Sequence, residues 1–276
     1  MTTSQPSDFS AYKAFEHKGW ERATPQYHDA FGYLTAQAIQ PLLESVDVRS
    51  GVRVLDVATG PGYVAAAAAQ RGANVVGIDF SAAMVAEARR CYPALPFQEG
   101  DAEDLPFPDK SFDAVVMNFG LMHLERPEQA LAEAHRVLRA GGKLAFTVWA
   151  KPEEAVGFGM VLRAVQQYGS MNVPLPPRPP LFRFSEPAES RRVLLEAGFM
   201  APEVRLVPQV WRLRSPDALF ENMQGSTVRT AGLLRAQTPG ALQAIRAALR
   251  DMAGSYQKGE KIELPMPAVL ASATKR

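Results

Sequence analysis

Cysteine is almost absent from this sequence, since Cys91 is the only one among 276 residues. A single thiol excludes an internal disulfide and any metal site built from several cysteines, so we expect no bound metal. The first twelve residues lack an apolar run behind a basic patch, so neither a secretory signal nor a membrane span is indicated. These absences predict a cytoplasmic protein.

An excess of charge of either sign is also missing, because 30 Lys and Arg residues face 29 Asp and Glu residues. Proteins that neutralise nucleic-acid phosphates usually carry a marked basic excess. The sequence has no internal repeat at a solenoid period and no long charge block. The expected partner is therefore a small molecule and not a nucleic acid, while a homodimer stays open.

What the sequence does contain is an alternation, from Arg53 onward, of short β-branched runs with helical stretches, which predicts a parallel sheet built from βαβ units. Strands are expected at 52–57, 74–80, 96–98, 112–117, 143–149, 204–213 and 262–273. Helices are expected at 63–70, from 81 onward, from 127 to the glycine pair at 141–142, and at 159–168, 187–197, 217–223 and 240–252. Segment 12–45 reads as helical with breaks at Pro25 and Pro41.

The turn after the first strand, ATGPG, is rich in small residues. Ala58, Gly60 and Gly62 let a ligand approach the backbone closely, although dinucleotide sites have a similar turn and some such turns only allow close packing. Asp56 separates these readings. A carboxylate at the mouth of the turn would repel a pyrophosphate, whereas it suits a ligand that carries an ammonium group.

Two further carboxylates follow the next strands. Asp79 ends the second strand, where an acidic residue accepts hydrogen bonds from ribose hydroxyls. Asp101 follows the third strand in the run EGDAEDLPF, where it can accept from the exocyclic amine of adenine while Ala102 leaves room for the ring. A solvated turn acid is the alternative for Asp101. We predict that the three acids converge on one adenosyl-amino-acid ligand.

Four segments, VLDVATGPG, VVGIDFS, EGDAEDLPFPDKSFDAVV and RVLRAGGKLAF, resemble the successive motifs of class I S-adenosylmethionine-dependent methyltransferases. The resemblance covers residues 52–149 and is closest to the broad group with the ubiquinone and menaquinone C-methyltransferases. It implies an α/β, Rossmann-like, seven-stranded, mostly parallel sheet with an antiparallel last strand. One departure is Ala58, because many members have glycine there.

The same resemblance implies one methyltransferase domain over residues 1–276. An amino-terminal helical lid would occupy 1–45 and the cofactor-binding core 46–150. Accessory cap segments with a late strand would occupy 151–260, and a terminal strand 261–276.

The resemblance also implies S-adenosyl-L-methionine as the cofactor and assigns residues to it. Asp56, Ala58 and Gly60 would line the methionyl end, and Asp79 would hold the ribose. Phe80 and Met84 would flank the adenine, Asp101 and Ala102 would complete its pocket, and Asn118 and Phe119 would lie near the sulfonium.

The expected mechanism is in-line displacement, in which the protein aligns the acceptor, excludes water and supplies a base for a protonated acceptor. His123 is one candidate base because its ordinary pKa suits proton removal near neutral pH, and a structural histidine is the alternative. His28, with Tyr27 beside it, is another if the amino-terminal helices cover the site. Trp20 and Tyr27 either contact the sulfonium through ring-to-cation attraction or pack within the lid.

We therefore predict a methyltransferase acting on O, N or C of a small, fairly apolar metabolite. Its single cysteine argues against arsenite methylation, and MNFGLM lacks the motif typical of enzymes that methylate base amines. An acceptor pocket is one reading of several apolar residues outside the core motifs and ordinary core is the other: Met160, Tyr168, Met171, Phe182, Phe184, Trp211 and Phe220. The alternatives are a nicotinamide-dependent oxidoreductase and a non-catalytic S-adenosylmethionine-binding protein.

Overall fold

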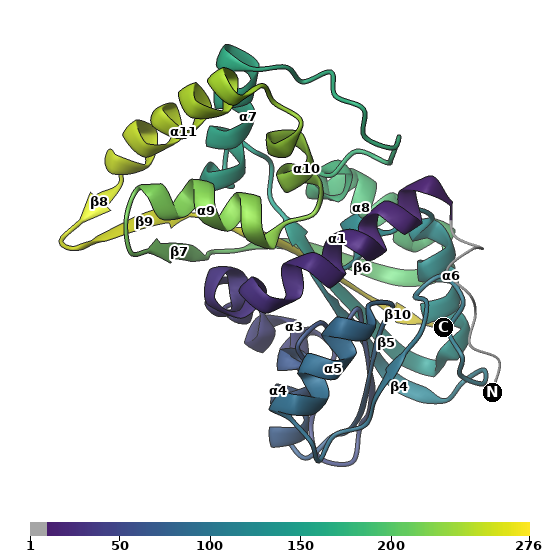
Figure 1. The fold of residues 1–276 in the computed structure, drawn as a ribbon. Helices are drawn as coiled ribbons and strands as arrows, with labels where there is room; N and C mark the ends of the chain where they lie inside the picture. The colour runs from purple at the N-terminus through teal and green to yellow at the C-terminus, as the bar shows by residue number, and fades with distance from the viewer. Residues whose placement is uncertain (1–9) are drawn as a thin grey trace.

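A seven-stranded sheet forms the centre of the computed structural model, which describes residues 10–276 (Figure 1). Its strands are β1 (Arg53–Val57), β2 (Asn74–Asp79), β3 (Phe97–Glu99), β4 (Phe112–Asn118), β5 (Leu138–Trp149), β6 (Phe199–Val207) and β10 (Ala268–Lys275). They lie in the order β3-β2-β1-β4-β5-β10-β6, and β10 pairs antiparallel with both β5 and β6. This topology confirms the predicted fold class.

Helices cover both faces of this sheet. The helices α3 (Ile39–Ser45), α4 (Tyr63–Gln70) and α5 (Ala82–Cys91) lie on one face, and α6 (Pro127–Val137) and α8 (Pro187–Glu196) lie on the other (Figure 1). The middle of β4, Ala114, Val115 and Val116, is fully buried, as expected of an apolar strand covered from both sides. None of the helices in residues 10–276 has the length and apolar character needed to cross a bilayer.

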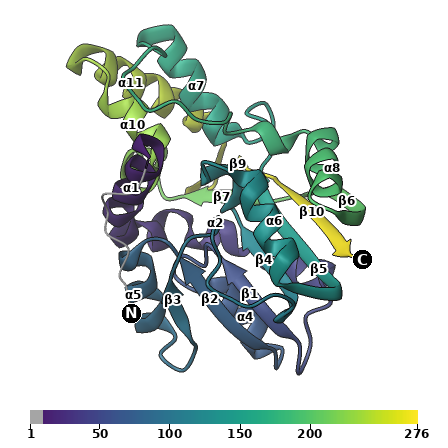
Figure 2. The same ribbon diagram turned by 90° about the vertical axis from the view of Figure 1, so that its right-hand side faces the viewer.

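A second lobe stands beyond the carboxyl edge of the large sheet (Figures 1 and 2). It contains α7 (Val156–Tyr168), α9 (Asp217–Ser226), α10 (Arg229–Arg235) and α11 (Pro239–Gly254). A small antiparallel sheet joins them in the order β7-β9-β8, formed by β7 (Val210–Leu213), β8 (Gln257–Lys258) and β9 (Lys261–Pro265).

The amino-terminal helix α1 (Ala11–Tyr27) packs against α5 of the core and α9 of the second lobe (Figures 1 and 2). The chain continues through a π-helical turn (His28–Gly32) and α2 (Tyr33–Ala36) before α3. The predicted break at Pro25 is wrong, because Pro25 lies inside α1 and the π turn follows it without interruption. Pro41 does not break the chain either, since it lies in the first turn of α3, where a backbone N–H has no partner within the helix.

Two predicted late strands are each divided by a proline. The expected strand 204–213 is β6 and β7 in two different sheets, with Pro208 between them. The expected strand 262–273 is β9 and β10, with Pro267 between them. Proline donates no ladder hydrogen bond, so each strand ends there and the chain passes to the other sheet.

The strand β5 also begins earlier than predicted, directly after α6. It runs through the glycine pair because its register with β4 shifts there and Gly141 adopts a φ of +74°. This is a conformation that glycine reaches without steric cost, so the pair forms an irregularity within the strand and not the end of a helix.

The central packing yields a stability prediction. Phe146 on β5 is fully buried and meets Phe184 edge-to-face, with ring centroids 6.3 Å apart. We expect Phe146→Ala to lower the free energy of unfolding by about 3–5 kcal/mol, because a large cavity replaces the ring. Urea denaturation followed by circular dichroism measures the change. The control is Leu206→Ala, because Leu206 is an exposed residue of β6. Its free energy of unfolding should fall by no more than about 0.5 kcal/mol. Equal losses in the two variants would contradict the assigned core.

Candidate functional site

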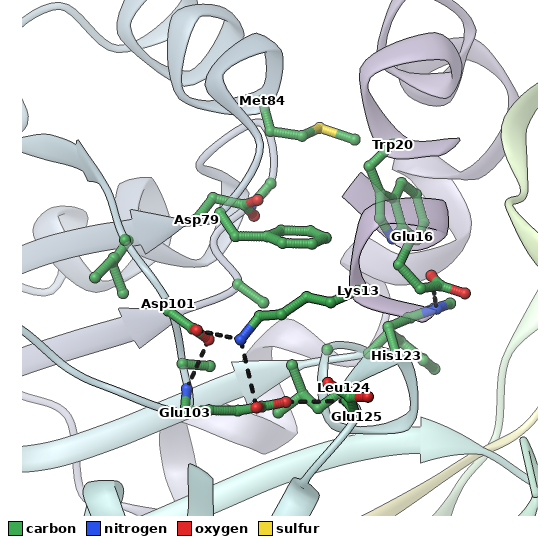
Figure 3. A pocket seen from close by; sticks show the side chains of 18 of the residues that line it. Lys13, Glu16, Trp20, Asp79, Met84, Asp101, Glu103, His123, Leu124 and Glu125 are labelled. Carbon is green, nitrogen blue, oxygen red and sulfur yellow. Dashed lines mark hydrogen bonds and ion pairs between the residues drawn. The ribbon is translucent and has the colours of Figure 1, made fainter. Parts of the chain in front are cut away.

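A cavity of about 770 Å³ opens at the carboxyl edge of the large sheet and is closed on one side by α1 (Figure 3). Parallel strands end together at this edge, so the turns that follow β1, β2 and β4 share the cavity wall. The residues predicted from the sequence that line it are Trp20, Tyr27, Ala58, Gly60, Asp79, Phe80, Met84, Asp101, Ala102, Asn118, Phe119 and His123.

The turn after β1 leaves open space for a ligand. Gly60 adopts a φ of +53°, and a Cβ built on it would meet no protein atom within 4 Å. Its backbone N–H donates to Asp79 Oδ2 at 2.8 Å, which ties the turn to the end of β2. Ala58 has the same positive φ of 53°, a conformation that glycine adopts more readily than alanine.

Asp79 is a buried carboxylate with capacity to accept further hydrogen bonds. Besides the bond from Gly60, its Oδ1 accepts from the backbone N–H of Ser81 at 3.0 Å. Burial raises the pKa of Asp79 to about 6, and these two backbone donors oppose the rise. Each carboxylate oxygen has a second lone pair, so hydroxyl donors entering the cavity can still bind.

Asp56 lies beneath the turn and does not line the cavity. Its Oδ2 accepts from Thr59 Oγ1 at 2.6 Å and from the backbone N–H of Ala65 at 3.0 Å, which couples β1 to the start of α4. Its Oδ1 is buried without a hydrogen-bond partner among residues 10–276. Burial raises the pKa of Asp56 to about 7. The structure therefore shows Asp56 holding the turn, and its contact with an ammonium group remains a prediction.

Asp101 is paired with a lysine that the sequence analysis did not name. Lys13 of α1 forms ion pairs with Asp101 and, at 3.4 Å, with Glu103 (Figure 3). Glu103 also accepts from Arg126 Nε at 3.0 Å and from two backbone N–H groups of the loop before α6. Burial alone would raise the pKa of Glu103, but Arg126 and Lys13 outweigh it and the pKa is lowered. The Asp101 carboxylate is thus part of a charged network at the α1 wall.

His123 is oriented by a buried carboxylate. It ends the short 3-10 helix Leu121–His123 after β4, and its Nδ1 lies 3.2 Å from Glu16 Oε2 of α1 (Figure 3). The ring of Trp20 packs edge-on against the imidazole of His123, with ring centroids 4.9 Å apart. The hydroxyl of Tyr12 donates a hydrogen bond to the backbone carbonyl of His123 at 3.2 Å. Contact with Glu16 through Nδ1 leaves Nε2 as the nitrogen for a bound molecule.

The structure does not bring His28 to the cavity. His28 lies on the exposed side of the π turn, where its Nδ1 is 2.6 Å from the hydroxyl oxygen of Tyr63. Tyr27 directly precedes His28, but the two side chains point to different sides of the helix. Tyr27 lines the cavity and His28 does not. A role for His28 as a base at this cavity therefore has no geometric support.

A second cavity of about 480 Å³ adjoins the first, and Trp20, Tyr27, Phe119 and His123 line both. Half of the residues that line this second cavity carry aromatic rings, and the ring of Phe119 stacks on that of Trp149 with centroids 4.1 Å apart. The other lining residues are Phe31, Met122, Phe158, Leu181, Ser226, Thr227, Val228, Arg229 and Thr230. His123 therefore sits where the two cavities meet.

The apolar residues predicted for an acceptor pocket or for ordinary core divide into three groups. Met171 and Phe182 line a third cavity beside the second. The buried ones, Met160, Phe184, Trp211 and Phe220, line none of the three cavities, and Tyr168 is exposed. For most of these residues the ordinary-core interpretation is the better one.

Sequence reasoning missed a set of residues that line the first cavity: Lys13, Glu16, Ile78, Gly100, Glu103, Gly120, Leu124 and Glu125. Those after strand ends could have been found from their position beside the predicted motifs. Lys13, Glu16 and Trp20 share one face of α1 at helical spacing, which is a detectable signal. That signal does not say what the face contacts. Residues 10–276 contain no group of three His, Cys, Asp or Glu side chains placed to hold a metal ion.

Comparisons with known proteins identify the class of this site. Residues 55–146 match the family described as a methyltransferase domain, and residues 8–99 match protein-L-isoaspartate(D-aspartate) O-methyltransferase. The demethylmenaquinone methyltransferase of Beutenbergia cavernae is 46% identical over 110 residues, which are 40% of this chain and 46% of that protein. The corresponding protein of Thermus thermophilus is 44% identical over 121 residues, 42% and 54% of the two chains. The chain thus spans about half the length of these curated relatives.

Solved structures share the fold over most of the chain. The YcgJ protein of Bacillus subtilis has a TM-score of 0.58 at 21% identity and covers 87% of this chain and 98% of its own. Phosphoethanolamine N-methyltransferase 2 of Haemonchus contortus was solved with S-adenosylhomocysteine. It has a TM-score of 0.59 at 16% identity, and the match covers 97% of this chain and 60% of that protein.

Residues 55–146 thus match the methyltransferase-domain family, and the chain has the class I S-adenosylmethionine-dependent methyltransferase fold. This confirms the resemblance carried by the sequence motifs. S-adenosylmethionine is the cofactor of this class.

The two buried aspartates make stability depend on pH. Burial raises the pKa of Asp56 to about 7 and that of Asp79 to about 6, whereas an aspartate in an unfolded chain has a pKa of about 3.9. Between these values the folded protein holds more protons than the unfolded chain, so raising the pH through this window lowers the free energy of unfolding. As the pH rises from about 4 to about 8, we expect the free energy of unfolding to fall less in Asp56→Asn than in the wild type. Urea denaturation at each pH measures this difference.

The matched control for this pH series is Asp29→Asn, because Asp29 is exposed. Its stability should follow the wild-type pH dependence. If Asp56→Asn did so as well, Asp56 would not titrate with a raised pKa in the folded protein.

Proposed function

We propose that this chain binds S-adenosylmethionine in the first cavity and transfers its methyl group to a small, fairly apolar acceptor bound in the second. The observation that supports this best is the junction of the two cavities at Trp20, Tyr27, Phe119 and His123. A displacement reaction needs the acceptor and the methyl donor in one enclosed space and in line. The two adjoining cavities offer such a space.

The first cavity suits the cofactor residue by residue. The carboxylate of Asp79 would accept from the ribose hydroxyls, and the missing side chain of Gly60 leaves room at the methionyl end. We assign the adenine to the space between Phe80, Met84 and Ala102, with Asp101 toward its amine. When bound, the cofactor supplies a methyl group on a good leaving group, so the protein mainly orients and desolvates the reactants.

The second cavity suits a flat apolar acceptor. The stacked ring of Phe119 and the tilted rings of Phe31 and Phe158 around Trp149 favour an aromatic or quinone-like ring. The curated relatives are described as demethylmenaquinone methyltransferases, which supports carbon methylation of such a ring. Transfer to O or N of an apolar metabolite stays within the same geometry.

We further propose that the chain is one functional domain in which residues 10–45 of the predicted lid 1–45 cover the site and 151–260 act as the cap. Residues 1–9 of that lid lie outside the described residues. The support is that α1 contributes Lys13, Glu16 and Trp20 to the first cavity, while the second lobe contributes Ser226 to Thr230 to the second cavity. Neither cavity is complete on the sheet alone.

His123 is the proposed base for an acceptor that must lose a proton. It lines both cavities, and Glu16 positions its ring through Nδ1 so that Nε2 can take the proton. Tyr27 is unsuited to this task, because burial raises its pKa to about 12 and it keeps its proton near neutral pH. Tyr27 would instead donate a hydrogen bond or pack against the acceptor.

A non-catalytic or differently catalytic cofactor-binding protein is the remaining alternative. The [4+2]-cyclase SpnF shares this fold at 19% identity with a TM-score of 0.58. The fold alone therefore does not settle the chemistry. A nicotinamide oxidoreductase is disfavoured by the methyltransferase-domain match.

The cofactor assignment predicts how binding responds to two neutralised carboxylates. We expect saturable binding of S-adenosylhomocysteine in calorimetry, weakened about tenfold in Asp79→Asn and in Asp101→Asn by loss of charge-assisted hydrogen bonds. The control Asp104→Asn changes an exposed acid of the same loop that does not line the cavity, and should bind as the wild type does. Absence of binding in the wild type would refute the proposed function itself.

The base assignment predicts a loss confined to the chemical step. With any acceptor that turns over in a panel of hydroquinones, phenols and amines, His123→Gln should lower kcat by about 10²–10⁴-fold because proton removal loses its acceptor. Affinity for S-adenosylhomocysteine should change little. Glu16→Gln should shift the pH profile of kcat, which a merely structural carboxylate would not do.

The control for the base is His135→Gln, because His135 packs against Phe199 on the other side of the sheet and lines neither cavity. Its kcat should equal that of the wild type. Wild-type turnover in His123→Gln would assign His123 a structural role.

A further inference from the structure

A third cavity of about 1100 Å³ continues from the second one toward the surface. The two share Phe158, Leu181, Arg229 and Thr230, so a molecule in the second cavity can extend into the third. The outer wall is formed by the proline-rich segment 173–180, with apolar side chains of α7 opposite it. Most of this wall is apolar, and its two charged residues are both arginines, Arg178 and Arg229.

These two arginines have no acidic partner in the part of the chain that the structure describes. Arg178 Nη1 donates to the carbonyl of Pro179 at 3.1 Å, and Arg229 Nη1 donates to the carbonyl of Pro176 at 2.6 Å. Neither forms an ion pair with a carboxylate within residues 10–276, in contrast to Arg183, which pairs with Glu128 and Glu189. A guanidinium carries five N–H donors, so each has further donors for a ligand.

The surroundings of the pair leave a surplus of positive charge. Burial lowers the pKa of Arg178, and the like charge of Arg229 lowers it further. The Glu16 carboxylate lies close enough to oppose this but forms no ion pair with either arginine, and it is already in contact with His123. Two partly buried like charges are unfavourable unless an anion accompanies them.

A second polar group near the same junction is unsatisfied. Ser226, at the end of α9, lines the second cavity, and its hydroxyl is buried with no hydrogen-bond partner among residues 10–276. Arg229 lies three residues later and lines both cavities. Arg229 thus lies where the second cavity opens into the third, with the buried Ser226 hydroxyl on the side of the second and Arg178 on the side of the third.

We propose that Arg178 and Arg229 bind an anionic group of the methyl acceptor, so that the acceptor has an apolar body and carries a carboxylate or a phosphate. The inference rests on the proposed function, since it takes the second cavity to be the acceptor site. Guanidinium groups recognise both anions through paired N–H donors. The apolar body would lie among the rings of the second cavity, with the anion at its outer end.

Matched naphthalene probes test this proposal on the full chain saturated with S-adenosylhomocysteine. Calorimetry compares 2-naphthoate, 2-naphthyl phosphate and uncharged 2-naphthol, which share one apolar body. We expect each anion to bind at least about tenfold more tightly than 2-naphthol, since a hydrogen bond to a charged group contributes that much. The tighter of the two anions identifies carboxylate or phosphate as the preferred group.

Variants then assign the preference to the two arginines. In the double variant Arg178→Gln/Arg229→Gln the anions should bind no better than 2-naphthol, while affinity for 2-naphthol and S-adenosylhomocysteine is kept. The double variant Arg178→Lys/Arg229→Lys retains the charge and should keep part of the preference. Arg235→Gln is the matched control, because Arg235 lies on α10 beside the site but lines none of the three cavities.

The outcomes separate this inference from the proposed function. If S-adenosylhomocysteine does not bind the wild type, the proposed function fails. If it binds but anions and 2-naphthol bind equally, or the preference survives in the double glutamine variant, only the anion site fails. Retained affinity for S-adenosylhomocysteine shows that the glutamine variant is folded, and the lysine variant serves if it is not.

Discussion

Helices on both faces of the large sheet bury its central strands so completely that polar side chains are confined to the strand ends. Apolar residues follow Arg53 in β1 and Asp113 in β4, and the next polar residues, Asp56 and Asn118, lie near the carboxyl edge. The site therefore forms where the parallel strands stop together. The hydrogen bond from Gly60 to Asp79 then joins two of these ends into one wall.

The opposite wall comes from distant parts of the chain. Helix α1 packs between α5 and α9, and its inner face contributes Lys13, Glu16 and Trp20 to the first cavity (Figure 3). Through Glu16 this helix orients His123, and through Lys13 it neutralises Asp101. One helix thus links the part of the site suited to adenine with the part where the acceptor would react, and couples both to the second lobe.

The core and the second lobe contribute different kinds of residues to the cavities. The core presents backbone turns and carboxylates that suit a common cofactor, and it matches the family over residues 55–146. The lobe and the segment that follows α7 contribute Phe158, Leu181 and Arg229 to both the second and the third cavity, and Arg178 to the third. The curated relatives align over about half of their length, and most residues that line the second and third cavities lie outside segment 55–146. Such division is usual where one fold carries many chemistries.

By itself, the sequence determined the sheet of the core, the helix starts at Ser81 and Pro127, and the strand-end residues that reach the cavity. These features depend on local patterns: apolar periodicity, capping residues and a glycine-rich turn. The division of the late strands between two sheets, the structural place of Asp56 and the outward position of His28 were decided only by the tertiary structure. So were the contacts of Lys13 and Glu16, more than 85 residues from their partners. Contacts of this length depend on how whole elements pack, and no local pattern encodes that packing.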